Sequence, residues 1–283
     1  MKLMVTGATG QLGSLVVDAL LKLVSAENIA VSVRDPKKAS HLSTLGIDVR
    51  HGDFHHPDSL AAAFTGIDRL LIISTNDMQQ RAQQHTNAVK AAQEANVGFI
   101  AYTSAPNAQD STLSIAGDHR ATEDVIINSG IPYSILRNNW YLENELGTIQ
   151  AVLKGAPWVT SAGTGRVGWA GRRDYAAAAA RVLAGEGHHN TVYELSGKPL
   201  TQEELASIVA GVSGREIEVQ QVDDESYGKI MVSAGVPEAM IPFVVGIQRD
   251  IREGALDVES NDFDKLLDRP ITPLGEVLKQ IIN

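Results

Sequence analysis

Apolar runs and helical patterns alternate along the first half of the chain. Short segments rich in strand formers are separated by segments whose apolar residues recur every three or four positions, as Leu12, Val16, Leu20 and Leu23 do. The predicted strands are 2–6, 29–33, 48–51, 69–74, 99–103 and 133–136. The predicted helices between them are 12–24, 59–64, 79–95 and 117–129. Connections long enough to cross over a sheet predict an α/β fold, with a doubly wound parallel sheet and helices on both faces.

The alternation loosens beyond about Asn138, where glycines mark a loop-rich stretch at 155–171. The elements predicted after it are a helix at 173–184 with five consecutive alanines, a strand at 191–195, a helix capped by Thr201 and Glu204, and a short strand near 216–221. We therefore expect one domain of residues 1–138, to which residues 160–190 return. A smaller, mostly helical portion of residues 139–283 follows.

Composition narrows the class of protein. Of the 283 residues, 43% are hydrophobic and 20% charged, which is typical of a globular chain and excludes disorder as the main state. The absence of Cys excludes disulfides, thiol nucleophiles and Cys-ligated metals. No apolar run approaches the roughly 20 residues needed to cross a bilayer, and no signal-peptide pattern is present, so we expect a cytoplasmic protein with no membrane partner.

Charge argues against nucleic acid as a partner. The net charge is -10, and nearly all the excess acid lies in residues 190–283, with 17 acidic and 8 basic side chains. An acidic chain without a basic stripe attracts neither nucleic acid nor anionic lipid. A small-molecule partner is therefore expected.

A glycine motif stands between the first predicted strand and the first predicted helix. Gly7 permits a tight turn, Gly10 lets the backbone approach a pyrophosphate, and Gly13 allows close helix packing. The helix N-terminus then offers N–H groups and a positive dipole end to the anion. The predicted cofactor-binding residues of this turn are Thr6, Gly7, Thr9, Gly10, Gln11, Leu12 and Gly13. The alternative is a glycine-rich loop without a ligand.

Arg34 follows the second predicted strand, where dinucleotide-binding folds recognise the adenosine ribose. An acid there binds the 2′-OH of NAD, whereas an arginine accommodates the 2′-phosphate of NADP. Arg34 therefore favours NADP(H), with Asp35 one position further on. The alternative is a solvated surface arginine.

Polar residues also follow the third and fourth predicted strands. Asp53 comes after the third, and Ser74, Thr75 and Asn76 come after the fourth, at the edge where such sheets bind ligands. Asp53 is a candidate acceptor for the adenine amino group, or else a turn former ahead of Pro57.

Together these segments resemble the NmrA-like branch of the atypical short-chain dehydrogenase/reductase superfamily, over most of the chain. The matching segments are Val5–Gly13, Arg34, Gly52-Asp53, Tyr102-Thr103-Ser104, Ser129–Tyr133 and Leu136-Arg137-Asn138, followed by Trp140-Tyr141, Asn144 and an Arg-Asp-Tyr-Ala helix. Within that branch the chain is most similar to bacterial NADPH-dependent quinone oxidoreductases and triphenylmethane dye reductases.

The resemblance implies a Rossmann domain that binds NADP(H), with the substrate over the nicotinamide and under the C-terminal portion. It adds Thr103 and Asn138 to the predicted cofactor-binding residues. The predicted substrate-binding residues are Ser104, Asn139, Trp140, Tyr141 and Asn144. Trp140, Tyr141, Trp158 and Trp169 would form aromatic walls around a flat substrate or, alternatively, core.

One departure from the superfamily concerns the chemistry. Ordinary members use a Tyr-x-x-x-Lys pair, but counting back from Ser129 puts His119 in the lysine position and Ile115 in the tyrosine position. A quinone reduced by hydride gives a delocalised anion that water can protonate, so positioning can supply most of the rate. His119 is then the candidate catalytic residue, as a substrate orienter or hydrogen-bond donor, or else a structural histidine.

We therefore predict an NADPH-dependent oxidoreductase that transfers hydride to a quinone or similar conjugated electrophile. The alternative from another class is a non-catalytic, NADP(H)-sensing regulator, which would also lack the Tyr/Lys pair. A sugar-nucleotide epimerase or dehydratase ranks third, because those reactions depend on the missing tyrosine. We expect no metal, because neither His119 with Glu123 nor the set His51, His55 and His56 combines the spacing and the third ligand of a metal site.

Overall fold

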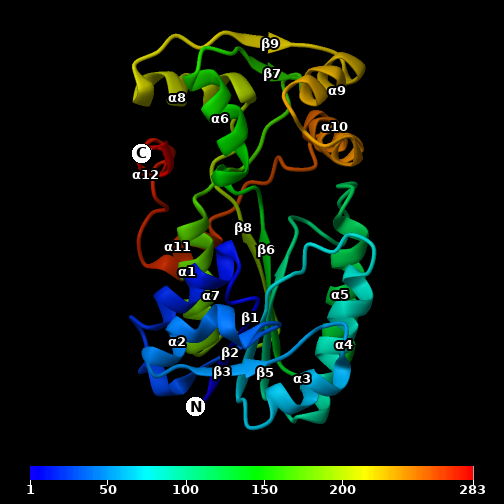
Figure 1. Ribbon diagram of the computed structural model, residues 1–283, viewed down its shortest axis with the longest axis vertical. Coiled ribbons are helices and arrows are strands. Elements are labelled where there is room, and N and C mark those ends of the chain that lie inside the picture. The colour runs from blue at the N-terminus through cyan, green and yellow to red at the C-terminus, as the bar shows by residue number, and fades with distance from the viewer. Residues whose placement is uncertain (283) are drawn as a thin grey trace.

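The fold is described by a computed structural model, which covers residues 1–282. A seven-stranded parallel sheet runs in the order β3-β2-β1-β4-β5-β6-β8 (Figure 1). Its strands are β1 (Leu3–Thr6), β2 (Ile29–Val33), β3 (Asp48–His51), β4 (Arg69–Ile72), β5 (Phe99–Ser104), β6 (Tyr133–Asn138) and β8 (Thr191–Leu195). The strand order reverses between β1 and β4, which is where such sheets bind ligands. The predicted fold class is confirmed.

Helices cover both faces of this sheet (Figure 1). One face carries α1 (Gln11–Leu20), α2 (Ser40–Thr44), α7 (Arg172–Ala184) and α11 (Asp262–Leu267). The other carries α3 (Pro57–Phe64), α4 (Arg81–Glu94) and α5 (Ala116–Asn128). Neighbouring strand residues therefore enter different cores: Leu3 and Val5 pack on the α1 side, and Met4 packs on the α4 side. This two-sided burial explains the continuous apolar runs in the sequence.

Among the described residues, α1 and α7 make the most extensive contact between two helices. Leu12, Val16 and Leu20 form the buried face of α1, and the alanine run of α7 belongs to the same core. Small side chains on α7 let the two helix axes approach closely. Because each helix precedes or follows a strand of the parallel sheet, both begin at the carboxyl edge of the sheet, and their N-termini lie on the same side of the molecule.

The C-terminal portion has a second core, which contains Trp158, Trp169 and Leu205. Two short parallel strands, β7 (Trp158–Thr160) and β9 (Val219–Gln221), lie at its far end (Figure 1). Its helices are α6 (Leu146–Leu153), α8 (Gln202–Ser213), α9 (Asp224–Ser233), α10 (Ile241–Arg252) and α12 (Leu274–Ile282). The predicted capping box of Thr201 and Glu204 starts α8.

Several elements differ from the sequence predictions. The first helix ends at Leu20 rather than 24, because the residues after it form tight turns. The strand β4 ends at Ile72 rather than 74, since the next backbone N–H groups bind side chains instead of a neighbouring strand. The strand β7 was not predicted. None of the helices formed by residues 1–282 is long and apolar enough to cross a membrane.

Candidate cofactor site

A cavity of about 780 Å³ opens at the carboxyl edge of the sheet, around the point where the strand order reverses. Most of the predicted site residues meet there. Those that line the cavity are Thr6, Gly7, Thr9, Gly10, Gln11, Leu12, Gly13, Arg34, Asp53, Ser74, Thr75, Asn76, Thr103, Tyr141 and Asn144. Five others, Ser104, His119, Asn138, Asn139 and Trp140, do not line it.

The glycine turn forms one wall of the cavity. Gly7 has a φ of 63°, and its carbonyl accepts the Gly10 N–H at 2.9 Å. A Cβ at Gly13 would lie 2.2 Å from the Gly7 carbonyl oxygen, so only glycine lets α1 start this close to the turn. No side chain caps α1 at Gly10, which leaves its first N–H groups and its positive dipole end to a ligand. This cradle fits the pyrophosphate of a dinucleotide.

Arg34 lies at the rim of the cavity, directly after β2. Its side chain is exposed, and it makes no hydrogen bond or ion pair within residues 1–282. Asp35, in contrast, already has a hydrogen-bond partner: its Oδ1 accepts the Lys37 N–H at 3.0 Å and caps the turn that follows. The free cation rather than the acid therefore faces the expected position of the adenosine ribose.

A second cation, Arg172, was missed by the sequence reasoning. It is the first residue of α7, and it lines the same cavity. Its guanidinium lies 4.9 Å from the centroid of the Tyr141 ring and donates to Asn144 Oδ1 at 3.3 Å. No carboxylate pairs with this guanidinium anywhere in residues 1–282. A sequence signal existed, because a cation at the start of a helix that begins at the carboxyl edge can face the site.

Asp53 forms the turn ahead of Pro57, which is one of its two predicted alternatives. It lines the cavity, and its Oδ1 accepts the His55 N–H at 3.0 Å while Oδ2 lies 3.3 Å from His56 Nδ1. Its carboxylate therefore organises the turn before α3 and leaves less capacity for a ligand. Other lining residues absent from the prediction are Ser32, Val33, Gly52, Phe54, His55, Ile73, Asp77 and Gln84. Among these, the Ser32 hydroxyl is buried without a hydrogen-bond partner in the described part of the chain.

Tyr141 lines the cavity and carries a neutral hydroxyl. Asn138 Nδ2 donates to its Oη at 3.0 Å, so Asn138 orients the phenol from outside the cavity. Burial raises the pKa of Tyr141, which keeps the phenol protonated at neutral pH. The arrangement offers a hydrogen-bond donor next to the place where a bound ligand would lie.

Comparisons with known proteins agree with this geometry. Residues 7–185 match the model of the NAD(P)H-binding family. The chain belongs to the NAD(P)H-binding family. Quinone oxidoreductase 2 of Escherichia coli is 39% identical over 280 residues, which is 99% of this chain and 98% of that protein. The structure of Citrobacter sp. triphenylmethane reductase complexed with NADP(H) is 41% identical, with a TM-score of 0.95 over 99% of this chain and 100% of that chain.

An NmrA-like family domain-containing oxidoreductase of Aspergillus flavus is 27% identical over 304 residues, which is 100% of this chain and 95% of that protein. The resemblance inferred from the motifs is therefore confirmed. So is the prediction of a nicotinamide dinucleotide cofactor.

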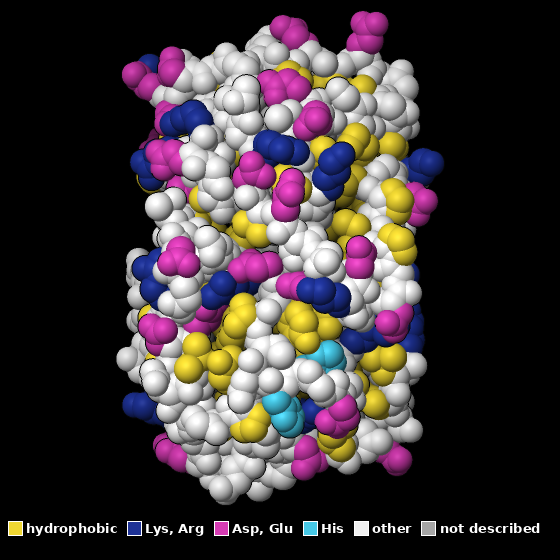
Figure 2. All heavy atoms as spheres, turned by 180° about the vertical axis from the view of Figure 1, so that it is seen from behind, with side chains coloured by type: hydrophobic (Ala, Val, Ile, Leu, Met, Phe, Trp, Pro, Cys, Tyr) yellow, Lys and Arg dark blue, Asp and Glu magenta, His cyan; other side chains and the backbone are white. Residues whose placement is uncertain are grey.

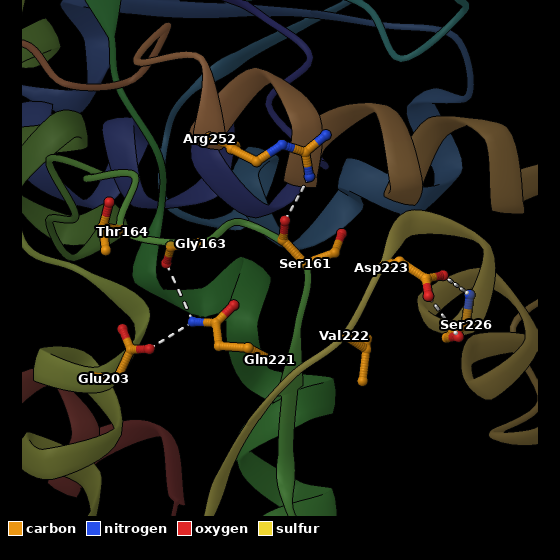
Figure 3. A pocket seen from close by; sticks show the side chains of 9 residues that line it. All are labelled: Ser161, Gly163, Thr164, Glu203, Gln221, Val222, Asp223, Ser226 and Arg252. Atoms are coloured by element: carbon orange, nitrogen blue, oxygen red, sulfur yellow. Dashed lines mark hydrogen bonds between the residues drawn. The ribbon is translucent and has the colours of Figure 1, made fainter.

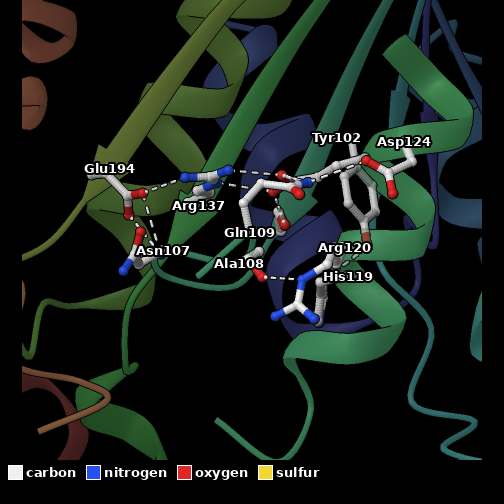
Figure 4. Close-up of polar contacts among 11 residues, drawn as sticks. Tyr102, Asn107, Ala108, Gln109, His119, Arg120, Asp124, Arg137 and Glu194 are labelled. Atoms are coloured by element: carbon white, nitrogen blue, oxygen red, sulfur yellow. Dashed lines mark hydrogen bonds and ion pairs between the residues drawn. The ribbon is translucent and has the colours of Figure 1, made fainter. Parts of the chain in front are cut away.

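In this NAD(P)H-binding protein, His119 is a buried residue of α5 and lies outside the cavity. Its side chain is buried, and its Nδ1 lies 2.8 Å from the Tyr102 hydroxyl (Figure 4). Burial, and next the positive charge of Arg81, lower the pKa of His119 to about 4. The residue is thus a neutral, structural histidine in its observed contacts, and its predicted contact with substrate has no support in this geometry.

Ser104 belongs to a buried ionic network with Glu123 and Arg137. Its hydroxyl donates to Glu123 Oε1 at 2.6 Å, and Glu123 accepts two hydrogen bonds from Arg137 at 3.0 and 2.8 Å. Arg137 also donates to Glu194 at 2.9 Å. The network joins β5, β6, β8 and α5, so Ser104 and Arg137 stabilise the sheet rather than line the cavity.

Asn139 and Trp140 make their hydrogen bonds within the C-terminal portion. Asn139 Nδ2 donates to Ser196 Oγ at 3.0 Å and to the Leu256 carbonyl at 3.1 Å. The indole N–H groups of Trp140 and Trp169 both donate to Glu145 Oε1 at 3.1 Å. Trp158 and Trp169 are fully buried, so these two tryptophans are core rather than substrate walls.

A second hollow lies in the C-terminal portion, between α10 and β9 (Figure 3). Arg252 donates to the Ser161 carbonyl at 2.6 Å, and Gln221 donates to the Gly163 carbonyl at 3.1 Å. Arg252 also pairs with both oxygens of Asp224 at 2.8 and 2.9 Å. The charged groups around this hollow satisfy one another, and they leave little for a ligand.

On the face shown in Figure 2, acidic and basic side chains are interspersed.

Proposed function

We propose that the chain is an NADPH-dependent oxidoreductase that transfers hydride to a quinone or a similar conjugated electrophile. The observation that carries the proposal is the pairing of the uncapped glycine turn with the unpaired Arg34 at one cavity. The turn suits a pyrophosphate, and the free guanidinium at the end of β2 suits a 2′-phosphate. The substrate class follows from similarity to the quinone oxidoreductase of E. coli and the triphenylmethane reductase of Citrobacter.

The reduced nicotinamide, when bound, supplies the hydride. The protein's own part is to hold that cofactor across the carboxyl edge, between the glycine turn and the wall that carries Tyr141 and Arg172. Arg172 adds positive charge to a cavity that must take an anionic ligand, although the chain as a whole is acidic. Both arginines therefore favour an anionic dinucleotide, and Arg34 favours the one that carries a 2′-phosphate.

The missing Tyr/Lys pair limits which acceptors can react. Ile115, in the tyrosine position, packs against the apolar core of the C-terminal portion, and His119 is buried. Neither supplies a proton to the cavity. Reduction of an ordinary ketone needs a proton donor for the alkoxide, whereas a hydroquinone anion takes its proton from water. Tyr141, with its phenol proton retained, would orient an acceptor oxygen by a hydrogen bond.

The test is NADPH oxidation against a small panel of quinones, triphenylmethane dyes, aldehydes and simple ketones. We expect turnover with quinones or dyes and little with unactivated ketones. With a 4-deuterated cofactor, a primary isotope effect in single-turnover oxidation identifies hydride transfer as the observed step. Tight NADPH binding without oxidation by any acceptor would contradict the proposal and favour a regulator that senses the cofactor.

A further inference from the structure

The chain leaves β4 in an unusual way. Three successive backbone N–H groups donate to side chains: Ile73 to Thr6 Oγ1 at 3.0 Å, Ser74 to Thr103 Oγ1 at 2.9 Å, and Thr75 to His85 Nε2 at 3.0 Å. All three acceptor side chains are at most 3% exposed. The backbone of 73–77, which forms a wall of the cofactor cavity, is therefore held from behind by buried polar side chains.

The helix α4 supplies most of this support. Arg81 Nε donates to the Thr75 carbonyl at 3.0 Å, and His85, one turn along the same helix face, accepts the Thr75 N–H. Both backbone groups of Thr75 are thus bound by one helix. Gln84 lies between Arg81 and His85 on this helix. Its Nε2 donates to Asp77 Oδ2 at 2.7 Å and holds the other end of the loop.

The contacts of His85 fix its proton. A backbone N–H can only donate, so Nε2 must be the bare nitrogen and Nδ1 must carry the hydrogen. Nδ1 then donates to Thr122 Oγ1 at 2.9 Å, and the Thr122 hydroxyl donates to the Asp118 carbonyl at 2.8 Å. The Tyr102 hydroxyl oxygen lies 2.8 Å from His119 Nδ1 and 3.3 Å from His85 Nδ1. The protons of His85 and Thr122 therefore have one consistent assignment.

The surroundings keep His85 neutral. Burial is the first cause, followed by His119 and the Arg81 guanidinium, and together they lower its pKa to about 3. A protonated imidazole would turn an N–H toward the N–H of Thr75 and break the contact. The acceptor at Nε2 is therefore available over the whole physiological pH range.

We propose that His85 and Arg81 are positioning residues for the cofactor, which hold Thr75 so that the loop 73–77 is preorganised as a wall of the binding cavity. The proposal rests on the proposed use of NADPH. It assigns to α4 a role in cofactor affinity, although His85 and Arg81 do not line the cavity themselves. The same contacts would exist without ligand, so they can be tested separately.

The experiment compares His85→Leu with His85→Gln. Leucine fills the space without an acceptor, whereas the Gln amide can accept from Thr75 and donate toward Thr122. Lys90→Gln, an exposed position on the same helix, is the matched control. NADPH affinity and melting temperature are measured for the parent protein and for these three variants. We expect a roughly 5- to 150-fold loss of affinity for Leu, because the loop can relax in the free protein but must leave the Thr75 N–H buried and unsatisfied when NADPH binds, and a loss of less than about 3-fold for Gln and the control.

Affinity that is unchanged in folded His85→Leu, whatever its melting temperature, would overturn the proposal and leave His85 a purely stabilising residue. An equal loss in Gln and Leu would overturn it as well. If His85→Leu does not fold, ring ¹⁵N shifts of the unliganded parent protein decide: a hydrogen on Nδ1 that persists down to pH 5 is expected, and one on Nε2 contradicts the proposed contact. Because that reading needs no NADPH, failure of the proposed function remains distinguishable from failure of this contact.

Discussion

Two walls of the same cavity are built on opposite principles. The glycine turn at 7–13 has its shape because side chains are absent, and its contacts lie within one short segment. The loop 73–77 has its shape because buried side chains are present, and they come from β1, β5 and α4. The first wall is local and carries no titratable group. The second is assembled from distant parts of the chain, and it depends on the protonation state of a histidine.

The largest expected effect comes from filling the glycine wall. The backbone at Gly10 is extended, with φ -83° and ψ 171°, and a Cβ there would lie 3.1 Å from the Gly7 carbonyl oxygen. Gly10→Val should therefore fold, but its branched side chain would occupy the space of the pyrophosphate. We expect no measurable NADPH binding by titration, with near-native circular dichroism. A folded variant that keeps its affinity would disprove the phosphate cradle.

Removing the cation at the rim should have a smaller, selective effect. Arg34→Ala is expected to weaken NADPH by roughly 10- to 150-fold, the worth of one charge-assisted hydrogen bond, and to leave NADH almost unchanged. Parallel titrations with the two cofactors measure this selectivity. Lys38→Ala, exposed in the following turn, is the matched control. Equal losses for NADPH and NADH would show that Arg34 does not recognise the 2′-phosphate.

Acid should lower the free energy of unfolding through two buried histidines, one of which supports the loop 73–77. Burial holds the pKa of His85 near 3 and that of His119 near 4, both below the ordinary value of 6.5. Below pH 6.5 the unfolded chain therefore takes up protons that the folded chain excludes, and the free energy of unfolding falls. Each histidine contributes a slope of up to about 1.4 kcal/mol per pH unit. Urea unfolding at pH 7, 6 and 5 should show that His119→Gln removes part of this decline, and an unaltered slope would contradict the inferred burial of a neutral imidazole.

The smallest effect is expected on turnover in His119→Ala. The side chain lies behind the sheet, bonded to Tyr102, so its loss should lower the rate constant for quinone reduction by less than about 10-fold. Steady-state kinetics with saturating NADPH measure it. A loss of the 10²- to 10⁴-fold size typical of general acid catalysis would instead make His119 a proton donor.

The first wall and its rim could be read from the sequence. Buried parallel strands leave apolar runs, and a glycine motif between a strand and a helix has few other uses, so the turn and Arg34 were placed correctly at the cavity. The second wall could be read only in part. Ser74, Thr75 and Asn76 were predicted to line the cavity because they follow a strand, but nothing local shows that a histidine ten residues later holds Thr75.

Polar residues on helices were difficult to place from the sequence. Arg81, Gln84 and His85 look like a solvated helix face, yet they are buried because the loop 73–77 and α5 cover them. Counting back from a turn gave His119 its place along the chain, but not the direction of its side chain. Arg172 was missed for a related reason: its importance depends on α7 lying beside α1, and that arrangement belongs to the tertiary structure.

The packing of α7 on α1 also has a consequence for biosynthesis. Leu12, Val16 and Leu20 leave the ribosome early, but α7, which shares their core, begins only at residue 172. At ordinary translation speeds of about 5 to 20 residues per second, the apolar face of α1 remains without this partner for on the order of ten seconds. The nascent chain therefore cannot close its cofactor cavity until translation has passed α7, and that interval is when a chaperone that binds exposed leucine and valine would act.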